Sequence, residues 1–398
     1  MDGQQRIERL CATATYQIAG RPTGRPTYAA VCSRLGRGLS ARRRTFEYLQ
    51  RAILRAKRDD AELLIVPGTA PEAWVRRGAE LFDVPVREVT VAAPAERDAV
   101  LVALADRVVA VWVRRGGKIA TLVAQRLRLC ADDSTWVAVN EDSACAASEL
   151  IDQGAVGWYL RDAAPQTSSA CDLIAARPAQ PSNDVSNAPQ ARVLLSADAM
   201  DWSEYLVHCT RGRQGPLPGQ TDTQYRDEVL LGGEGGQPAT AIETLQAILR
   251  SGWLLGSSRV TRAETPVVCW SAVPLPELLR RRTFRPHLGR WDYEPFGIAI
   301  RRTLAARLRL LPVLYGTAAD HDRLAPEDRW RFQAIGKRIN WRAEQEWRCR
   351  GGLDLSQIGD NDAVVFAHSP QALPALQRLS RWPVVDVDTF LCVGERVQ

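Results

Sequence analysis

The sequence contains no long hydrophobic run. No stretch reaches the ~18 apolar residues that a membrane-spanning helix needs, and the opening residues, MDGQQRIERLCATATYQ, have no hydrophobic segment of a secretory signal. The nine cysteines stand singly, without a CxxC pair, so neither a zinc site nor a disulfide framework is predicted. We therefore expect a cytoplasmic protein that makes no membrane contact and binds no metal.

Lysine is also scarce. It occurs only at positions 57, 118 and 337, so arginine carries nearly all of the positive charge in a chain of formal net charge +6. Basic residues gather in 1–60, where thirteen stand against five acidic residues, and in 280–350, where seventeen stand against eight. Basic zones with interleaved aromatic residues indicate contact with nucleotides or nucleic acid, and solvated surface charge is the alternative.

Between residues 60 and 160, short apolar runs alternate with amphipathic stretches. The runs predict strands at 63–68, 86–91, 107–113, 136–140 and 156–160, with helices at 71–82, 96–106, 118–129 and 143–154. Buried strands that alternate with helices through short connections are typical of a parallel sheet covered on both faces. We predict that 1–161 form a Rossmann-like α/β domain with an open parallel sheet, in which 1–60 contribute an irregular start and a helix at 40–58.

Two loops of this domain follow predicted strands, where open α/β sheets bind their ligands. One contains Gly68 and Thr69, and the other runs from Arg114 through Arg115, Gly116 and Gly117 to Lys118. Glycines at a helix start beside cations suit a phosphate, although a tight turn with solvated side chains would look the same. The order IVPGTAPEAW, a strand, then RRGGKIATL resembles the SLOG and DprA-like Rossmann families, which implies a nucleotide or nucleic-acid ligand.

A composition change marks the boundary of a second domain. Residues 162–192 are rich in Pro, Ser, Ala and Asn and are predicted to be a linker. Residues 193–398 are predicted to form an α+β domain of short strands and few helices. Within it we expect a polar Gly/Pro-rich insertion at 214–239 with a mobile loop at LGGEGGQP, and a final strand at 384–393.

The stretch WRAEQEWRCR (341–350) is the strongest candidate for chemistry. It places Glu344 and Glu346 two residues apart in a frame of tryptophans and arginines. On a strand the two carboxylates would share a face, and on a helix they would diverge by roughly 200°. The residue types leave strand and helix open, and a solvated ion-paired surface is the competing interpretation.

The order HCTR, an amphipathic helix, VVCWS, PFGIAIRR, LPVLYG and EQEWR (203–352) resembles the ADP-ribosyltransferase-like proteins of phage defence and toxin systems, of the DarT and AbiGi types. The resemblance implies that the second domain is ADP-ribosyltransferase-like and binds NAD. It also implies a catalytic Glu346 and a His208 that contacts the nicotinamide ribose. The other cofactor-binding residues that it implies are Thr210, Arg211, Trp270 and Ser271.

Around this site, an acceptor is expected to contact Glu344, Trp347, Arg281 and Arg285. The implied function is ADP-ribosyl transfer or NAD cleavage, on a nucleic-acid or protein acceptor, in an anti-phage or toxin system with an antitoxin or another defence protein as partner. Two alternatives remain: a metal-dependent nuclease or nucleotide hydrolase that uses Glu344 and Glu346, and a non-catalytic protein that binds nucleic acid through its arginines.

Overall fold

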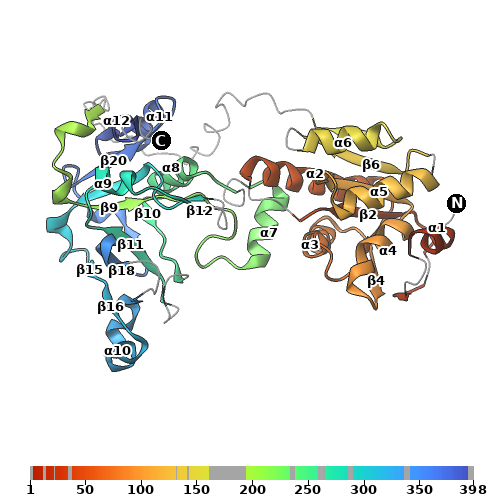
Figure 1. Ribbon diagram of the computed structural model, residues 1–398, viewed down its shortest axis with the longest axis horizontal. Coiled ribbons are helices and arrows are strands. Elements are labelled where there is room, and N and C mark those ends of the chain that lie inside the picture. The colour runs from red at the N-terminus through yellow and green to blue at the C-terminus, as the bar shows by residue number, and fades with distance from the viewer. Residues whose placement is uncertain are drawn as a thin grey trace, which may run out of the picture. The chain divides into compact units, whose positions relative to one another are not determined.

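A computed structural model describes most of the chain (Figure 1). The described residues are 3–11, 15–21, 23–34, 38–130, 132–140, 143–160, 194–233, 238–258, 261, 265–285, 290–335 and 341–392. The chain divides into two compact units. The first unit comprises 1–183 and 221–237, and the second comprises 184–220 and 238–398. The predicted linker, 162–192, lies outside the described residues.

The first unit is built on a seven-stranded mixed sheet of order β1-β4-β3-β2-β5-β6-β7. Its strands are β1 (Tyr16–Ile18), β2 (Thr27–Cys32), β3 (Glu62–Ile65), β4 (Val86–Val91), β5 (Arg107–Trp112), β6 (Thr135–Val139) and β7 (Val156–Tyr159). All neighbours pair in parallel except β1, which is antiparallel to β4 at the edge. From β2 the chain builds outward first through β3 and β4, then on the other side through β5, β6 and β7. The strand order therefore reverses between β2 and β5.

Helices cover both faces of this sheet, as the alternating pattern predicted. They are α1 (Gly3–Leu10), α2 (Leu39–Arg58), α3 (Glu72–Phe82), α4 (Arg97–Leu104), α5 (Lys118–Leu129) and α6 (Ala144–Ile151). Buried residues of α1, α4, α5 and α6 share one hydrophobic cluster with the sheet, and those of α2 and α3 share the other. The expectation of an α/β domain with a largely parallel sheet is thus confirmed. The central strand β2 was missed, because 1–60 were expected to start irregularly.

The helix α7 (Asp222–Leu231) belongs to the first unit although its sequence interrupts the second. It contacts α2 and α3 (Figure 1) and buries Tyr225, Val229 and Leu230. On α3, Arg77 holds both carboxylate oxygens of Asp227, at 2.5 and 2.8 Å. Residues 222–231 of the predicted insertion at 214–239 therefore form a docked helix, and residues 234–237 of LGGEGGQP lie outside the described residues.

The second unit contains a mixed eight-stranded sheet of order β15-β18-β11-β9-β14-β20-β21-β8. These strands are β8 (Leu194–Ser196), β9 (Tyr205–Cys209), β11 (Val267–Ser271), β14 (Phe296–Arg301), β15 (Leu311–Pro312), β18 (Glu346–Arg350), β20 (Ala363–Ala367) and β21 (Val384–Asp386). The neighbours are antiparallel apart from β20–β21 and β21–β8. The smaller pairs are β10 (Trp253–Leu254) with β19 (Leu353–Asp354), β12 (Phe284–Arg285) with β13 (Arg290–Trp291), and β16 (Leu314–Gly316) with β17 (Phe332–Ala334).

Helices of the second unit pack on both faces of its large sheet. They are α8 (Ala241–Ser251), α9 (Leu275–Arg280), α11 (Leu373–Leu379) and α12 (Asp388–Cys392). The helix α10 (Ala318–Arg323) has no buried residue and contacts β16 instead. One hydrophobic cluster joins the sheet to α8 and α11, and the opposite one joins it to α9 and α12. The predicted final strand at 384–393 is only half right, because it ends at Asp386 and a helix follows.

Candidate functional site

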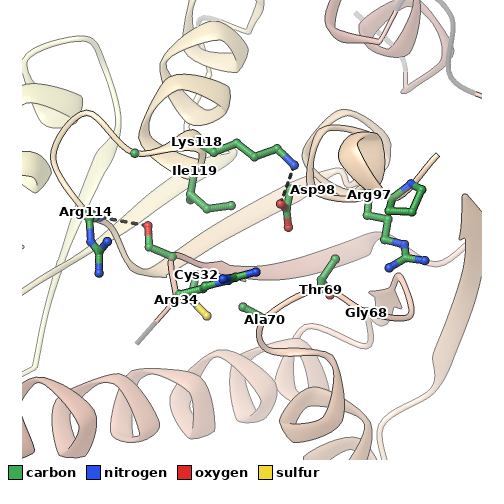
Figure 2. A pocket seen from close by; sticks show the side chains of 13 residues that line it. Cys32, Arg34, Gly68, Thr69, Ala70, Arg97, Asp98, Arg114, Lys118 and Ile119 are labelled. Carbon is green, nitrogen blue, oxygen red and sulfur yellow. Dashed lines mark hydrogen bonds and ion pairs between the residues drawn. The ribbon is translucent and has the colours of Figure 1, made fainter. Parts of the chain in front are cut away.

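A cavity of about 670 Å³ opens at the carboxyl ends of the parallel strands of the first unit (Figure 2). It lies at the ends of β2, β3 and β5, where the strand order reverses and where open α/β sheets bind their ligands. Its lining comes from four loops and comprises Cys32, Ser33, Arg34, Gly68, Thr69, Ala70, Pro94, Arg97, Asp98, Arg114, Gly117, Lys118 and Ile119.

The cavity wall carries four cationic side chains and one carboxylate. The Lys118 ammonium group donates to Asp98 at 2.9 Å and to the carbonyl of Ala95 at 2.7 Å. Within the described residues, Arg34, Arg97 and Arg114 make no ion pair. The wall is therefore strongly positive, and the three guanidinium groups retain their hydrogen-bond donors for a ligand.

Local backbone geometry brings the loops close together. Gly68 has a φ of +84°, and the space that a Cβ atom would occupy there is filled by the guanidinium group of Arg97. At the end of β5, the N–H of Arg114 donates to the Ser33 hydroxyl at 3.1 Å. This bond ties the loop after β5 to the loop after β2, across the point of reversal (Figure 2).

The two loops predicted from the sequence meet at this cavity. Gly68 and Thr69 line it together with Gly117 and Lys118, whereas Arg115 and Gly116 are not in its lining. Arg115 forms an ion pair with Glu149, at 2.7 Å. The sequence prediction missed the cations Arg34 and Arg97. The apolar run TYAAVC, which forms β2, was the signal that would have placed Arg34 at a strand end.

In the second unit, the stretch 341–350 is both helix and strand. A single 3-10 turn spans Trp341–Glu344, Gln345 takes a φ of +44°, and Glu346 begins β18. Glu344 and Glu346 therefore lie on either side of a backbone reversal rather than along one strand. The Ser271 hydroxyl on β11 fixes this turn by donating to the carbonyl of Glu344 at 2.6 Å.

A buried arginine holds Glu346. Arg348 donates through Nε to Glu346 Oε1 at 2.9 Å and through Nη2 to Oε2 at 3.2 Å. Its other donors bond the carbonyls of Trp330 and Phe332 and the side chain of Gln333. A charge-assisted pair with two bonds fixes the orientation of the carboxylate as well as attracting it.

Glu344 is held more loosely. Its Oε1 accepts from the Tyr293 hydroxyl at 3.0 Å. Burial, followed by the negative charge of Glu346, raises the pKa of Glu344, while the Tyr293 bond and the Arg211 charge oppose that rise. Glu344 therefore has the chemistry of a group that can exchange a proton.

His208 lies on β9, which pairs with β11. Its Nδ1 is 2.8 Å from the carbonyl of Cys269, and because a carbonyl only accepts, Nδ1 carries the hydrogen. Burial lowers the pKa of His208 to about 4, the Arg211 charge adds to this, and the Cys269 bond opposes it. The imidazole is therefore neutral near pH 7 and offers Nε2 as an acceptor.

Two further predicted residues carry buried polar atoms without partners. Among the described residues, the Thr210 hydroxyl and the indole N–H of Trp270 make no hydrogen bond. Leaving such a group buried and unsatisfied costs about 1–3 kcal/mol, so each indicates a missing partner. Trp270 is only 2% exposed and packs in the core, and its ring lies 5.4 Å from that of His208. The expected role of Trp270 as a ligand-contacting ring is therefore not supported by its burial.

His208 and Glu346 come from nearby strands but point to opposite faces of the sheet. Ser271 is paired with Val207 on one side and with Glu346 on the other. Paired residues share a face and successive residues alternate, so His208 faces away from Glu346. Arg211 links the two regions, because its charge acts on the pKa of both His208 and Glu344.

The predicted acceptor residues are partly engaged in the fold. Trp347 packs against the hydrophobic cluster on the face opposite Glu346. Arg281 pairs with Glu277 and donates to the carbonyl of Ala343 at 2.9 Å. Arg285 pairs with Asp292 at 2.7 Å.

Comparison of the chain with known protein families, with curated proteins and with solved structures finds no match. Within the described ranges, no three His, Cys, Asp or Glu side chains gather so as to hold a metal ion. In the same part of the chain, no helix has both the length and the apolar character to cross a membrane.

Proposed function

We propose that the second unit transfers ADP-ribose from NAD, or cleaves NAD, and that the first unit is a Rossmann-like module that binds a nucleotide or nucleic acid. The observation that favours the enzymatic proposal is that the charge of Arg211 acts on both His208 and Glu344, although His208 and Glu346 face opposite sides of the sheet. The resemblance of these stretches to ADP-ribosyltransferase-like proteins supports the same assignment, and it alone supports a role in phage defence or in a toxin system.

Unpartnered polar atoms support an NAD site at the end of β9. The neutral His208 offers an acceptor to a ribose hydroxyl, and the buried Thr210 hydroxyl has no partner within the described residues. Arg211 is exposed beside them and suits a phosphate of NAD. These groups would bind and orient the dinucleotide.

The carboxylates of Glu344 and Glu346 support the proposed cleavage of NAD. Breaking the bond between nicotinamide and ribose develops positive charge on the sugar, and a fixed carboxylate lowers the free energy of that charge. Glu346, oriented by Arg348, has this role in the proposal. Glu344, whose pKa burial raises, accepts the proton that the attacking hydroxyl, amine or water loses as its bond to the sugar forms.

Incubation of the full chain with labelled NAD, alone and with single-stranded DNA, RNA or cell lysate, tests the proposal. We expect release of nicotinamide, or transfer of label, that falls by at least about 100-fold in Glu346→Gln, since removing one electrostatic stabiliser of a transition state costs that much. Glu327→Gln is the matched control, because Glu327 is an exposed carboxylate of the same unit. Equal turnover in both variants would exclude Glu346 as the catalytic group.

Other outcomes identify the alternatives. Cleavage of nucleic acid that needs a divalent metal and ignores NAD would identify a nuclease that uses Glu344 and Glu346. Undiminished nucleic-acid affinity in a Glu346→Gln, His208→Ala double variant, with no turnover in either protein, would identify a binding protein without catalysis.

A further inference from the structure

The cavity of the first unit combines shape, charge and position. About 670 Å³ is the size of a site for a small organic ligand. Elsewhere in this unit, arginines such as Arg76, Arg77 and Arg107 are neutralised by carboxylates. In the cavity wall Arg34, Arg97 and Arg114 have no such partner within the described residues. The positive charge is therefore concentrated where a ligand would lie.

The residues at the end of β3 indicate which class of nucleotide the cavity can bind. Sheets of this topology that bind NAD commonly carry an Asp or Glu in the second strand region, which accepts hydrogen bonds from ribose hydroxyls, and an arginine near there favours an added phosphate. Residues 66–69, VPGT, contain no acid, and the guanidinium group of Arg97 lies against Gly68 instead.

Among the described residues that line the cavity, the one carboxylate, Asp98, already accepts a hydrogen bond. Asp98 accepts from Lys118 at 2.9 Å, so it is not a free acceptor for ribose hydroxyls. Beside the cations, Cys32, Ala70, Pro94 and Ile119 supply apolar surface of the kind on which a base or sugar can pack. The wall thus provides donors for several phosphate oxygens, an apolar patch, and few acceptors.

We propose that this cavity binds a nucleoside polyphosphate, with the phosphate groups held by Arg34, Arg97 and Arg114, and that it discriminates against NAD. The inference rests on the nucleotide-binding role proposed for the first unit and is independent of ADP-ribosyl transfer in the second. If both proposals hold, the two units bind different nucleotides: the second takes NAD as substrate, and the first takes a ligand with a terminal phosphate.

Calorimetric titration of the full chain with ATP, AMP and NAD tests this inference. We expect ATP to bind at least tenfold more tightly than AMP, and NAD to bind more weakly than ATP to the first unit. Because the second unit is itself proposed to bind NAD, the NAD titration is repeated in His208→Ala. The affinity for ATP should fall steeply with added salt, as expected for contacts between arginines and phosphates.

Single-cation variants locate the binding. Arg97→Gln and Arg114→Gln should each weaken ATP binding by about tenfold or more, the loss of one charge-assisted pair. Arg128→Gln on α5 is the control, because Arg128 is exposed and lies outside the cavity. Thermal unfolding of each variant shows whether it is folded, and only folded variants are compared. Because two separate cavity residues are substituted, the test remains valid if one variant does not fold.

Several results would overturn the inference. These are an affinity for NAD in the His208→Ala protein equal to that for ATP, an ATP affinity unchanged in both cavity variants, or no binding of ATP at millimolar concentration. Tighter binding of a 5′-phosphorylated oligonucleotide than of ATP, sensitive to Arg97→Gln, would replace the mononucleotide with a nucleic-acid end. The results with ATP and with the oligonucleotide do not depend on whether the second unit binds or turns over NAD, so failure here and failure of the proposed enzymatic function are separately visible.

Discussion

The neutral, half-buried imidazole of His208 makes the stability of the second unit depend on pH. Its folded-state pKa is about 4, against an ordinary value of 6.5. Between these two values the unfolded chain binds more protons than the folded one, so the free energy of unfolding decreases as the pH falls. The contribution of the neutral His208 to the free energy of unfolding is complete and constant above about pH 6.5, and it is lost below about pH 4.

The size of the effect follows from the two pKa values. Each unit of pKa difference corresponds to 1.36 kcal/mol, so the full contribution is about 3 kcal/mol, of which about 2 kcal/mol is lost between pH 7.5 and pH 5. In His208→Gln the amide N–H can still donate to the carbonyl of Cys269, which accepts from the imidazole at 2.8 Å in the wild-type chain, and the titration is removed.

Urea unfolding of the wild-type chain and of His208→Gln at pH 7.5, 6 and 5 measures this contribution. The difference between the two proteins cancels every other titrating group, including the other three histidines of the chain. We expect the advantage of the wild-type protein to shrink by about 2 kcal/mol from pH 7.5 to pH 5. A difference that stays constant to within about 0.5 kcal/mol would refute the burial of an uncharged imidazole.

Three further perturbations test the packing. Leu230→Ala, at a fully buried position on α7, should destabilise the first unit by about 2–5 kcal/mol, whereas Leu231→Ala, 61% exposed, should change its unfolding by less than about 0.5 kcal/mol. Arg348→Met should destabilise the second unit by about 3–5 kcal/mol because it leaves a partly buried carboxylate unpaired. The exposed Arg350→Met is its control in chemical denaturation. Asp227→Asn should cost about 1 kcal/mol and increase hydrogen exchange in α7. Normal protection of α7 in that variant would contradict a docking role for the ion pair.

The local pattern of apolar and polar residues was enough to locate most helices and strands of the first unit. The expected helix at 118–129 and strand at 86–91 agree with α5 and β4 residue for residue. In an α/β domain with a parallel sheet, the strands are buried on both faces and the helices on one face only. A strand is therefore a continuous apolar run and a helix an amphipathic stretch, and a short window of sequence distinguishes the two. The same argument failed at β2, because its run TYAAVC follows a turn-rich loop.

The candidate sites were less predictable. Gly68 and Lys118 were singled out because each follows a predicted strand, and both line the cavity. Arg97 was not singled out, because it begins a helix rather than following a strand. It reaches the cavity because its guanidinium group lies against Gly68, in the loop after β3. In the second unit the order of motifs in the chain cannot show whether His208 and Glu346 share a face, because that depends on the register of three paired strands.

By itself, the sequence determined where most strands and helices of residues 60–160 form, that this part carries a largely parallel sheet, and which loops follow its strands. These properties depend on the periodicity of apolar residues and on turn residues, which act over a few positions. Only the tertiary structure decided that α7 docks on the first unit, that three arginines without an ion pair in the described part of the chain meet in one cavity, and that Arg348 holds Glu346. The first two depend on contacts between residues far apart in the sequence, and Arg348, although only two residues from Glu346, is positioned by Trp330, Phe332 and Gln333; local propensity contains no information about such contacts.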